Sequence, residues 1–479
     1  MKKLTWALSG ALVMTLVGGC VSGSGEVGTD DNEEVIGEAE SAVTCPDVSG
    51  TNINRSLVVT DPEVLAKFSF KRTIDKIRTT ASVASTETSL GIYQTWMKTF
   101  TNAANGGSCD ESRVDPNNYG LECPRTAEAK LATVNPFAAS PSVKFVPVGL
   151  FNRFDLAPST GAHCGEYRIV YAMESTNANI SGRAFIIFEG ALPNPNPAAG
   201  VDACLPVAQF WQGLTTDPDV NSRATKLEKF YFTGGAVAGF STAVHAANYG
   251  LATNSDPATA GQIRTNFFVD FLEWHLREFK LRRTCTNTAD PATCTLDAQH
   301  VTVKVNPAEE LFAGTHTKSA TFRPTFVGQV KNLKATTVTG IKMGIQNQFN
   351  EWESVSQAIN VRYANVANTT IRTDIQTELT AQGSTLTVNN ILNRATTQTC
   401  AGCHQVSNSQ ALGGGLVWPN SLGFVHIDES STLSPALTGT FLPRRKVVLE
   451  KFINDRCTGV AAPAEAGTTV GDSLDGASN

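Results

Sequence analysis

The stretch VKFVPVGLFNRFDL, residues 143–156, gives the clearest sign of how this chain folds. Apolar residues alternate with other residues along it, which is typical of a β-strand whose two faces meet different surroundings. Four further runs have strand-like composition, namely 167–173, 183–188, 273–281 and 300–305. We expect the five runs to form one antiparallel sheet, with the last two joined as a hairpin that a disulfide clamps.

Apolar residues at helical spacing lie around these strands. The predicted helices cover residues 61–80, 89–102, 205–214, 223–232, 262–272, 324–334, 346–360 and 369–381, and two more near the C-terminus cover 388–399 and 444–454. The predicted fold class is therefore α+β, an antiparallel sheet with helices packed against it.

The composition is that of a globular protein. The chain has 479 residues, of which 41% are hydrophobic and 17% are charged, and this length suggests two or three domains. The net charge is −6 and there is no block of basic residues, so nucleic acid is not an expected partner.

The N-terminus has the features of an export signal. Lys2 and Lys3 precede a short apolar run that ends in Val17-Gly18-Gly19-Cys20. Small residues directly before a cysteine resemble the lipobox of bacterial lipoproteins. That resemblance implies cleavage of residues 1–19 and lipidation of Cys20, with an ordinary secretory signal as the alternative.

Residues 20–44 are acidic and rich in Gly and Ser, which predicts a disordered tether. Lipid on Cys20 would attach this tether to a membrane. We therefore expect a lipid-anchored protein of the bacterial cell envelope. The resemblance favours the outer membrane over the inner one, because Val21 stands where an Asp is often linked to inner-membrane retention.

The chain has eleven cysteines. If Cys20 carries lipid and Cys400 and Cys403 serve another purpose, eight remain, an even number that fits disulfides in an oxidising compartment. Proximity in the sequence suggests the pairs 109–123, 164–204 and 285–294, which leaves Cys45 with Cys457, although the connectivity stays open on sequence alone.

Near the C-terminus, Cys400-Ala401-Gly402-Cys403-His404 matches the Cys-x-x-Cys-His pattern of c-type haem attachment. Two thiols on one turn can bond the vinyl groups on one edge of a porphyrin, and the histidine that follows can bind the iron. We therefore expect one covalent haem c. Cys400 and Cys403 would attach it, and His404 would be the proximal ligand.

The elements around this motif, a helix, the CAGCH sequence, an apolar loop and a C-terminal helix, resemble those of small c-type cytochromes. The resemblance implies a small, mostly α-helical cytochrome c-like module over residues 385–460. An α+β domain of unknown function, 45–384, would precede it, and a disordered tail, 461–479, would follow it.

The motif departs from many such cytochromes because no methionine follows Cys403. His426 is the one histidine after His404, so we expect it as a possible distal iron ligand. The alternatives are a five-coordinate iron, a His426 that is simply buried and bonded to a carbonyl, or a ligand from the rest of the chain: His245, His275, His316 or Met343.

The CAGCH motif is also compatible with a redox dithiol, a structural disulfide, or half of a zinc site. A thioredoxin-like site needs a βαβ unit, which the predicted elements do not contain. A zinc site needs a second pair of ligands, and the remaining histidines are isolated in the sequence.

Charged residues flank two neighbouring predicted strands in the sequences NRFDL and HCGEYR. They could form a catalytic cleft with an acid, a base and anion-binding groups, or they could be paired charges that brace the edge of the sheet. The series NRFDL, HCGEYR, REFKL and CAGCH resembles uncharacterised bacterial envelope proteins, which implies no activity. The candidate residues are Arg153, Asp155, His163, Glu166 and Arg168.

These features predict a membrane-anchored mono-haem cytochrome that transfers single electrons to redox partner proteins in the envelope. The first alternative is a haem-dependent oxidoreductase that acts on a small substrate. The second is a non-haem surface binding lipoprotein with a structural CxxC disulfide.

Overall fold

The computed structural model describes residues 50–457, apart from 102–106, 108, 110–122, 124–128, 181, 257–259, 271–272 and 357–361. The predicted signal peptide, the tether with Cys20, the cysteine Cys45 and the whole predicted tail lie outside the described residues. The described residues belong to one compact unit.

A nine-stranded sheet forms the centre of this unit, with the order β1-β2-β3-β4-β6-β7-β5, and with β8 and β9 also paired to β7. The β5–β7 pairing is parallel, and the other strand pairs are antiparallel. The sheet is thus mixed but mostly antiparallel, where the sequence predicted an antiparallel sheet; the α+β fold class is confirmed. The strands are β1 Val58–Val59, β2 Val143–Arg153, β3 His163–Ser175, β4 Ala184–Pro193, β5 Ala252–Thr253, β6 Gln262–Asp270, β7 Glu273–Cys285, β8 Cys294–Val301 and β9 Glu353–Ser356.

Strand β6 occupies residues for which the sequence predicted a helix, 262–272. It pairs with β4 on one side and β7 on the other. Its alternate residues Ile263, Thr265 and Phe267 are all buried, as are Arg264 and Asn266 between them. A strand buried on both faces shows no simple polar alternation, which explains why the helical prediction was wrong.

A second predicted helix, 346–360, is also absent from the described part of that range. Asn347–Phe349 form a short 3₁₀ turn, and Glu353–Ser356 form strand β9 against the end of β7. The apolar residues that suggested a helix therefore belong to two separate elements, a 3₁₀ turn and a short strand.

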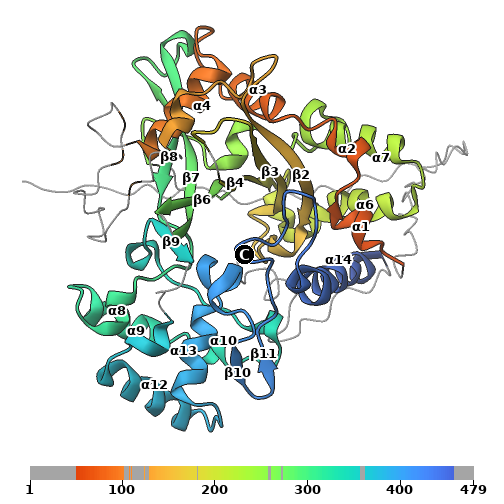
Figure 1. Cartoon of the computed structure of the whole chain (residues 1–479). Coiled ribbons are helices and arrows are strands. Elements are labelled where there is room, and N and C mark those ends of the chain that lie inside the picture. Colours follow the sequence, from red (N-terminus) through yellow and green to blue (C-terminus); the bar gives the residue numbers. More distant parts are fainter. Residues whose placement is uncertain are drawn as a thin grey trace, which may run out of the picture. The chain divides into compact units, whose positions relative to one another are not determined.

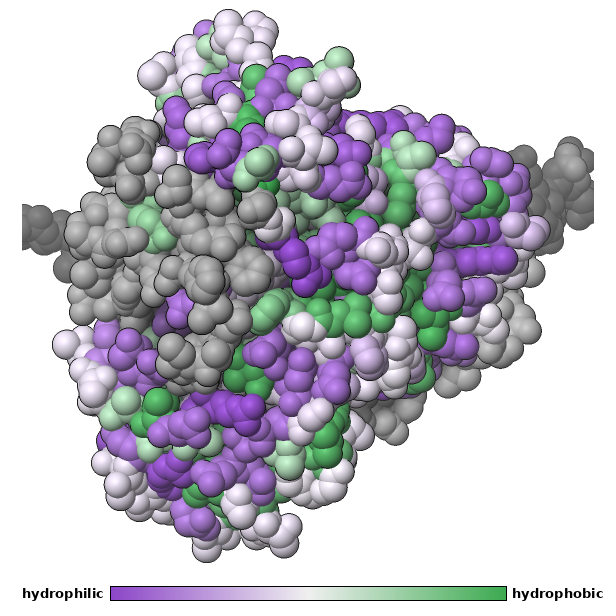
Figure 2. All heavy atoms as spheres, in the orientation of Figure 1, coloured by the Kyte–Doolittle hydropathy of each residue, from purple (hydrophilic) through white to green (hydrophobic). Residues whose placement is uncertain are grey.

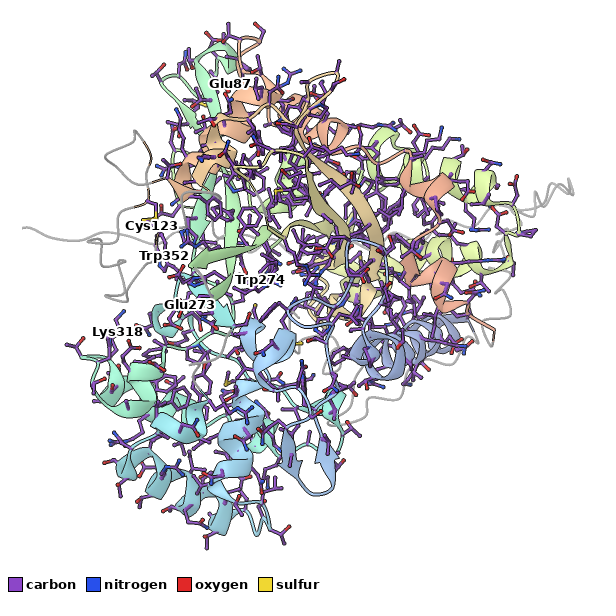
Figure 3. All side chains as sticks on the ribbon, viewed as in Figure 1. Glu87, Cys123, Glu273, Trp274, Lys318 and Trp352 are labelled. Carbon is purple, nitrogen blue, oxygen red and sulfur yellow. A yellow bond between two sulfur atoms is a disulfide. The ribbon has the colours of Figure 1, made fainter. Side chains whose placement is uncertain are left out.

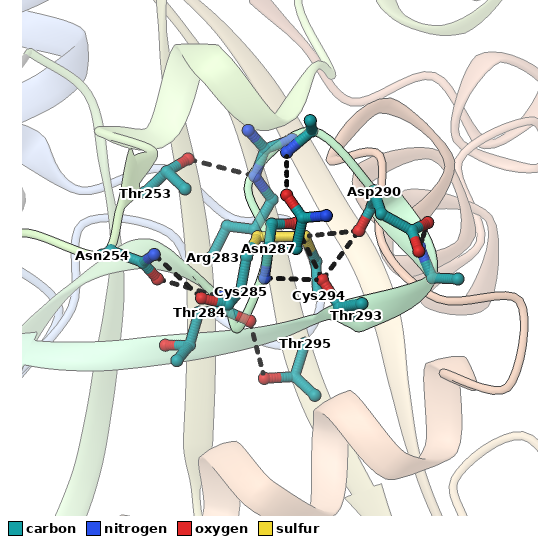
Figure 4. Close-up of a disulfide and its surroundings, with 12 residues drawn as sticks. Thr253, Asn254, Arg283, Thr284, Cys285, Asn287, Asp290, Thr293, Cys294 and Thr295 are labelled. Carbon is teal, nitrogen blue, oxygen red and sulfur yellow. Dashed lines mark hydrogen bonds between the residues drawn. A yellow bond between two sulfur atoms is a disulfide. The ribbon is translucent and has the colours of Figure 1, made fainter.

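The last hairpin of the sheet joins β7 to β8, and the disulfide Cys285–Cys294 closes it (Figure 4). The strand ends at Val301, so the predicted strand 300–305 was placed too late in the sequence. Asn254 holds the same end of the hairpin, because its side chain accepts from the Cys285 N–H and donates to the Cys285 carbonyl, at 2.8 and 2.9 Å.

Two further disulfides, Cys109–Cys123 and Cys164–Cys204, match the predicted pairs. Cys457 is also disulfide-bonded, and its predicted partner Cys45 lies outside the described residues. Three of the four predicted pairs are therefore confirmed.

Most predicted helices are present with small changes of their ends. The predicted helix 61–80 is two helices, because Ser69 caps the second by accepting from the Arg72 N–H at 3.3 Å. The α-helices are α1 Ile53–Ser56, α2 Pro62–Leu65, α3 Phe70–Thr80, α4 Ser89–Met97, α6 Leu205–Gly213, α7 Val220–Glu228, α8 Glu309–Ala313, α9 Ser319–Val327, α10 Val330–Leu333, α11 Tyr363–Val366, α12 Thr369–Ala381, α13 Val388–Thr396 and α14 Leu442–Cys457.

Two hydrophobic cores lie on either side of the segment that follows α13. The larger core contains α3, α4, α6, α7, α14 and apolar residues from both faces of the sheet. The smaller core contains α8 to α13 and includes Cys403 and Trp418. Figure 1 shows α8, α9, α12 and α13 together below the sheet, and α14 apart from them.

Residues 385–460 are therefore shared between the two cores, since α13 packs in the smaller core and α14 in the larger. A self-contained cytochrome-like module is not what the contacts of these residues show. Among the described residues, Val417 and Val447 are the large hydrophobic side chains that stay exposed, and hydrophilic residues occupy much of the face in Figure 2.

A buried cavity beside the CAGCH turn as candidate functional site

The CAGCH sequence follows shortly after helix α13, and its cysteines are buried. A capping box starts the helix, in which the Thr387 side chain accepts from the Asn390 N–H and the Asn390 side chain accepts from the Thr387 N–H. Its residues Ile391 and Leu392 are fully buried in the smaller core. After a short break, the chain turns again at Cys400 and continues as a π-helical turn, Gly402–Val406. Such turns are frequent at functional sites.

The position of this turn depends on Gly402. A β-carbon at this position would overlap the carbonyl oxygen of Thr396, so a larger residue would force the backbone to move. The Ala401 N–H donates to Ser354 Oγ at 2.9 Å, which ties the turn to strand β9. Cys403 N–H donates to the Thr399 carbonyl at 2.9 Å, so both cysteines lie on one helical turn.

The turn closes one side of a small cavity with a volume of about 80 Å³. This volume is below the range of roughly 300–1,000 Å³ that is usual for small-molecule and cofactor sites, so a group as large as a porphyrin requires the two walls to move apart. One wall is the sheet, through Phe151, Arg153, Arg168, Val170, Phe185, Ile187, Glu189, Arg264, Asn266 and Leu276. The other wall is the C-terminal segment, through Cys400, Cys403, His404, Val425, His426, Ile427, Leu437, Phe441 and Arg445.

The two cysteines at this cavity differ from the other described cysteines because they are free thiols. Cys400 is 2% exposed and Cys403 is 1% exposed. Burial raises the pKa of Cys400 to about 11 and that of Cys403 to about 12. Both thiols are therefore protonated at neutral pH, and neither has the lowered pKa of a thiol–disulfide exchange site.

His404 is held in one tautomer by the protein. Its Nδ1 lies 2.9 Å from the carbonyl oxygen of Phe424, which can only accept, so Nδ1 carries the proton. The Phe424 ring stacks on Trp274 of β7, with ring centroids 5.7 Å apart, and this contact positions the carbonyl. Figure 3 labels Trp274 and Glu273 at the start of β7, where the sheet meets the helices below it.

The same hydrogen bond leaves Nε2 of His404 with a free lone pair. Burial lowers the pKa of His404 to about 4, so the ring is neutral at physiological pH. A neutral imidazole whose other nitrogen donates to a carbonyl is the state in which histidine binds metals.

His426 lies next to His404, as the sequence predicted for a second ligand. Its Nδ1 is 2.9 Å from Ser434 Oγ, and its Nε2 is 3.3 Å from Cys403 Sγ. Burial and the neighbouring His404 lower its pKa well below the ordinary value. Two neutral imidazoles and two free thiols thus share one cavity.

The two histidine rings are 4.7 Å apart between centroids. With metal–nitrogen bonds of about 2 Å and roughly 1.1 Å from each nitrogen to its ring centre, one metal ion bound by both would hold the centroids ~6 Å apart. Two cysteines and two neutral histidines are donor types that hold a haem, but the rings lie closer together than one shared ion allows, and the cavity is too small for a porphyrin as it stands.

The sheet wall of the cavity carries buried charges in register across the strands. Arg168 of β3 lies opposite Glu189 of β4, with Nη1 and Oε1 3.0 Å apart. Glu189 also pairs with Arg264 of β6 at 3.3 Å, and Arg264 pairs with Glu278 of β7 at 3.2 Å. All four residues are at most 9% exposed, so this row of ions is covered from solvent.

The candidate residues of the sequence analysis fall into two groups. Arg153 and Arg168 line the cavity. Asp155 and Glu166 pair with them, at 2.9 and 2.7 Å. Burial would raise the pKa of Glu166, but Arg168 and Lys304 hold it below its ordinary value. The paired charges therefore form the wall of a covered cavity rather than a brace at an exposed sheet edge.

The fifth candidate, His163, is not among the described lining residues, and its Nδ1 accepts from the Gly165 N–H at 3.2 Å. The alternative iron ligands are also placed elsewhere in the described structure: His245, His275, His316 and Met343 do not line the cavity. His275, for example, is buried against Glu353 at 3.1 Å.

Sequence reasoning missed Glu189, Arg264, Glu278 and Arg445. The first three follow the period of two along β4, β6 and β7, and this signal was lost for β6 because a helix was predicted there. Arg445 lies on helix α14 between buried residues, and its charge gave no sign that it would be 7% exposed.

Among the residues that the structure describes, no group of three or more His, Cys, Asp or Glu side chains is arranged to hold a metal ion by itself. No helix in the described ranges is long and apolar enough to cross a membrane. Comparison with family models, with curated proteins and with solved structures finds no match to this chain.

Proposed function

We propose that this protein is a c-type haem protein, with one haem bound covalently by Cys400 and Cys403. The observation that carries the proposal is the pair of free, buried thiols on one turn, facing a cavity next to His404. The Phe424 carbonyl orients His404 and leaves its Nε2 available to the iron.

When bound, haem would supply a one-electron iron couple at this site. The chain's own residues would do the rest. Cys400 and Cys403 would fix the position of the porphyrin, and His404 would hold the iron through Nε2. Ser434 orients His426, which we propose as the distal ligand, and the apolar side chains Phe151, Phe185 and Leu437 would exclude water from the cavity.

The function we propose is electron transfer rather than catalysis, because a distal histidine would leave no iron position open to a substrate. A haem-dependent oxidoreductase is the alternative if His426 does not bind. A structural disulfide and a redox dithiol have less support. The thiols are free rather than joined to each other, and their raised pKa values do not suit a redox dithiol.

We propose a haem site that residues 385–460 build together with the upstream sheet, in place of a self-contained cytochrome c-like module. Residues 385–460 would provide the two cysteines that attach the haem and the two histidines that would hold its iron, and the sheet of the upstream residues would provide the opposite wall of the cavity. This arrangement gives the upstream domain a role as part of the haem site.

The first experiment is expression of the full chain with a cytochrome c maturation system, followed by a denaturing gel stained for haem. We expect a stained band at the mass of the protein, and we expect it to disappear in the double variant Cys400→Ser, Cys403→Ser. A wild-type chain that folds but carries no stain would falsify the covalent haem.

The second experiment tests the distal ligand. His426→Ala should convert the absorption spectrum from a six-coordinate to a five-coordinate form, and carbon monoxide or cyanide should then bind more readily. His316→Ala is the matched control, because His316 does not line the cavity. A spectrum that His426→Ala leaves unchanged would remove His426 as a ligand.

We also propose the bacterial cell envelope as the location, with lipid on Cys20 as the anchor and redox proteins of the envelope as partners. Cys20 follows a short apolar run after two lysines. Incorporation of labelled fatty acid into the wild type, and not into Cys20→Ser, would support the anchor. Absence of label in the wild type would exclude it.

A further inference from the structure

The cavity beside the CAGCH turn has an excess of positive charge on its sheet side. Four arginines line it, and Glu189 is the one carboxylate among the described lining residues. With the neighbouring ion pairs and lysines included, six basic groups face four acidic ones. The basic groups are Arg153, Arg168, Arg264, Arg445, Lys280 and Lys304, and the acidic groups are Asp155, Glu166, Glu189 and Glu278.

Lys280 is a buried basic group beside these ion pairs. Burial lowers its pKa to about 8, and the positive charge of Lys304 acts in the same direction. Its amino group donates to the Gly261 carbonyl at 2.5 Å. The excess of basic over acidic groups along this wall therefore favours negative charge in the cavity.

Arg445 is the least satisfied of the four arginines. It is 7% exposed, and its ion pair with Asp155 is long, with Nε and Oδ1 3.8 Å apart. Asp155 is already engaged by Arg153 at 2.9 Å. Among the described residues Arg445 has no closer acidic partner, and burial together with Arg153 lowers its pKa well below the ordinary value.

Arg168, in the same wall, has one buried donor without a partner among the described residues, its Nε. Its two terminal nitrogens bind Glu189 at 3.0 Å and Glu166 at 2.7 Å. A buried donor without a partner is unfavourable, so Arg168 would gain from an acceptor in the cavity, and Arg445 would gain from a closer one than Asp155.

We propose that Arg168 and Arg445 form a carboxylate-binding site on the sheet side of this cavity. Both arginines line the same cavity, and guanidinium groups suit carboxylates because they can donate two parallel hydrogen bonds to one carboxylate. The carboxylates could belong to the haem propionates, in which case the assignment rests on the proposed function. They could also belong to a free dicarboxylate, and then the site exists without haem.

The first arm of the test uses the haem-loaded full chain. Arg445→Gln should lower the midpoint potential of the haem, because removing a positive charge near the iron favours the oxidised form. It should also shift the pH dependence of the potential to higher pH, because a propionate without its cation has a raised pKa. Arg444→Gln, an exposed neighbour on the same helix, should change neither.

The second arm uses the variant Cys400→Ser, Cys403→Ser, which cannot attach haem, and titrates it with succinate in a calorimeter. Succinate should bind, and Arg445→Gln or Arg168→Gln should weaken binding about tenfold or more. Arg444→Gln should have no effect. Arg445→Lys keeps the charge and the fold, so it separates loss of the site from loss of structure.

The outcomes decide between the sources. A change of potential in Arg445→Gln, together with no succinate binding by the haem-loaded chain, assigns the site to the propionates. Succinate binding by the haem-loaded chain assigns it to a free dicarboxylate. If Arg445→Gln and Arg444→Gln behave alike in both arms, the site does not exist. The second arm gives its answer even if no haem is ever attached.

Discussion

The two faces of the central sheet are built from the same strands but differ in chemistry, because one carries an aromatic cluster and the other a row of ion pairs. On one face, residues such as Phe145, Tyr171 and Phe188 pack against Phe70 of α3 in an aromatic cluster. On the other face, Arg168, Glu189 and Arg264 alternate in a row. Both faces are buried, so alternation here separates an apolar interior from an ionic one rather than interior from solvent.

The ionic face is not explained by the stability of the fold. Burying ions in pairs gives little net stability, because the cost of desolvation offsets much of the attraction between them. An apolar face of similar shape would hold the sheet against its cover at least as well. The ionic face is therefore better explained by the cavity that it lines than by the stability of the fold.

The largest expected effect comes from breaking the ionic row at its centre. Glu189→Gln leaves Arg168 and Arg264 without their shared carboxylate, and we expect a loss of about 3–5 kcal/mol in the free energy of unfolding. Urea unfolding of the haem-free chain measures it. Glu174→Gln, on strand β3 with an exposed side chain, is the control. Equal effects of the two substitutions would show that the row is not buried.

The neighbouring residue tests the opposite face of the same strand. Phe188→Leu should cost about 1–2 kcal/mol, because it leaves a small gap among Phe70, Tyr171 and Tyr249. In the haem-loaded chain the absorption spectrum should not change, because Phe188 points away from the cavity. A spectral shift would mean that the two faces are coupled.

A smaller effect on the free energy of unfolding is expected when acid protonates His300, which lies on the aromatic face of the sheet. His300 stacks on Phe279, and its ring lies 2.7 Å from the Trp352 carbonyl through Nε2. Burial lowers its pKa to about 3. This contribution to stability is therefore present above pH 6.5 and is lost as pH falls towards 3.

Because His300 is only half-buried, we expect the effect between pH 7 and pH 4.5 to be about 1 kcal/mol. It is measured as the extra loss of stability in the wild type relative to His300→Gln. If both proteins lose the same stability on acidification, His300 is already protonated at no cost in the folded chain.

The smallest effect is expected where an ion pair is exposed. Lys144 and Glu174 pair across β2 and β3 at 2.7 Å, with both side chains about half exposed. The double substitution Lys144→Gln, Glu174→Gln should change the free energy of unfolding by only about 0.2–1 kcal/mol, and less in 0.5 M salt. A larger value would weaken the contrast between exposed and covered ions.

The sequence predicted the parts of the fold that depend on local pattern. Strands β2, β3, β4 and β7 and helix α12 were found because their spacing matches one period over many residues. Three disulfides were found because their cysteines are close in sequence. Strand β6 was not, because Arg264 and Asn266 are buried beside Ile263 and Phe267, and nothing local distinguishes these environments.

The site was only partly predictable for a similar reason. The motif identified Cys400, Cys403 and His404, and the position of His426 after it suggested the fourth residue. That Arg153 and Arg168 would meet this motif depends on contacts across more than 200 residues of sequence. Arg445 could not be found, because only the packing of α14 against the larger core turns it inwards.

The burial of the two thiols also has a consequence for the order of folding and haem attachment. At 1–2% exposure, neither sulfur of the finished fold can be reached by another protein. Any enzyme that joins haem to them must therefore act while the covering segment, residues 425–445, is still open. Cys457 lies further along the chain, at the end of helix α14, so under the proposed function its disulfide would form after the haem is attached. Under the proposed function, the order of the two reactions would matter, because oxidation at Cys457 before haem attachment would yield a folded chain without haem.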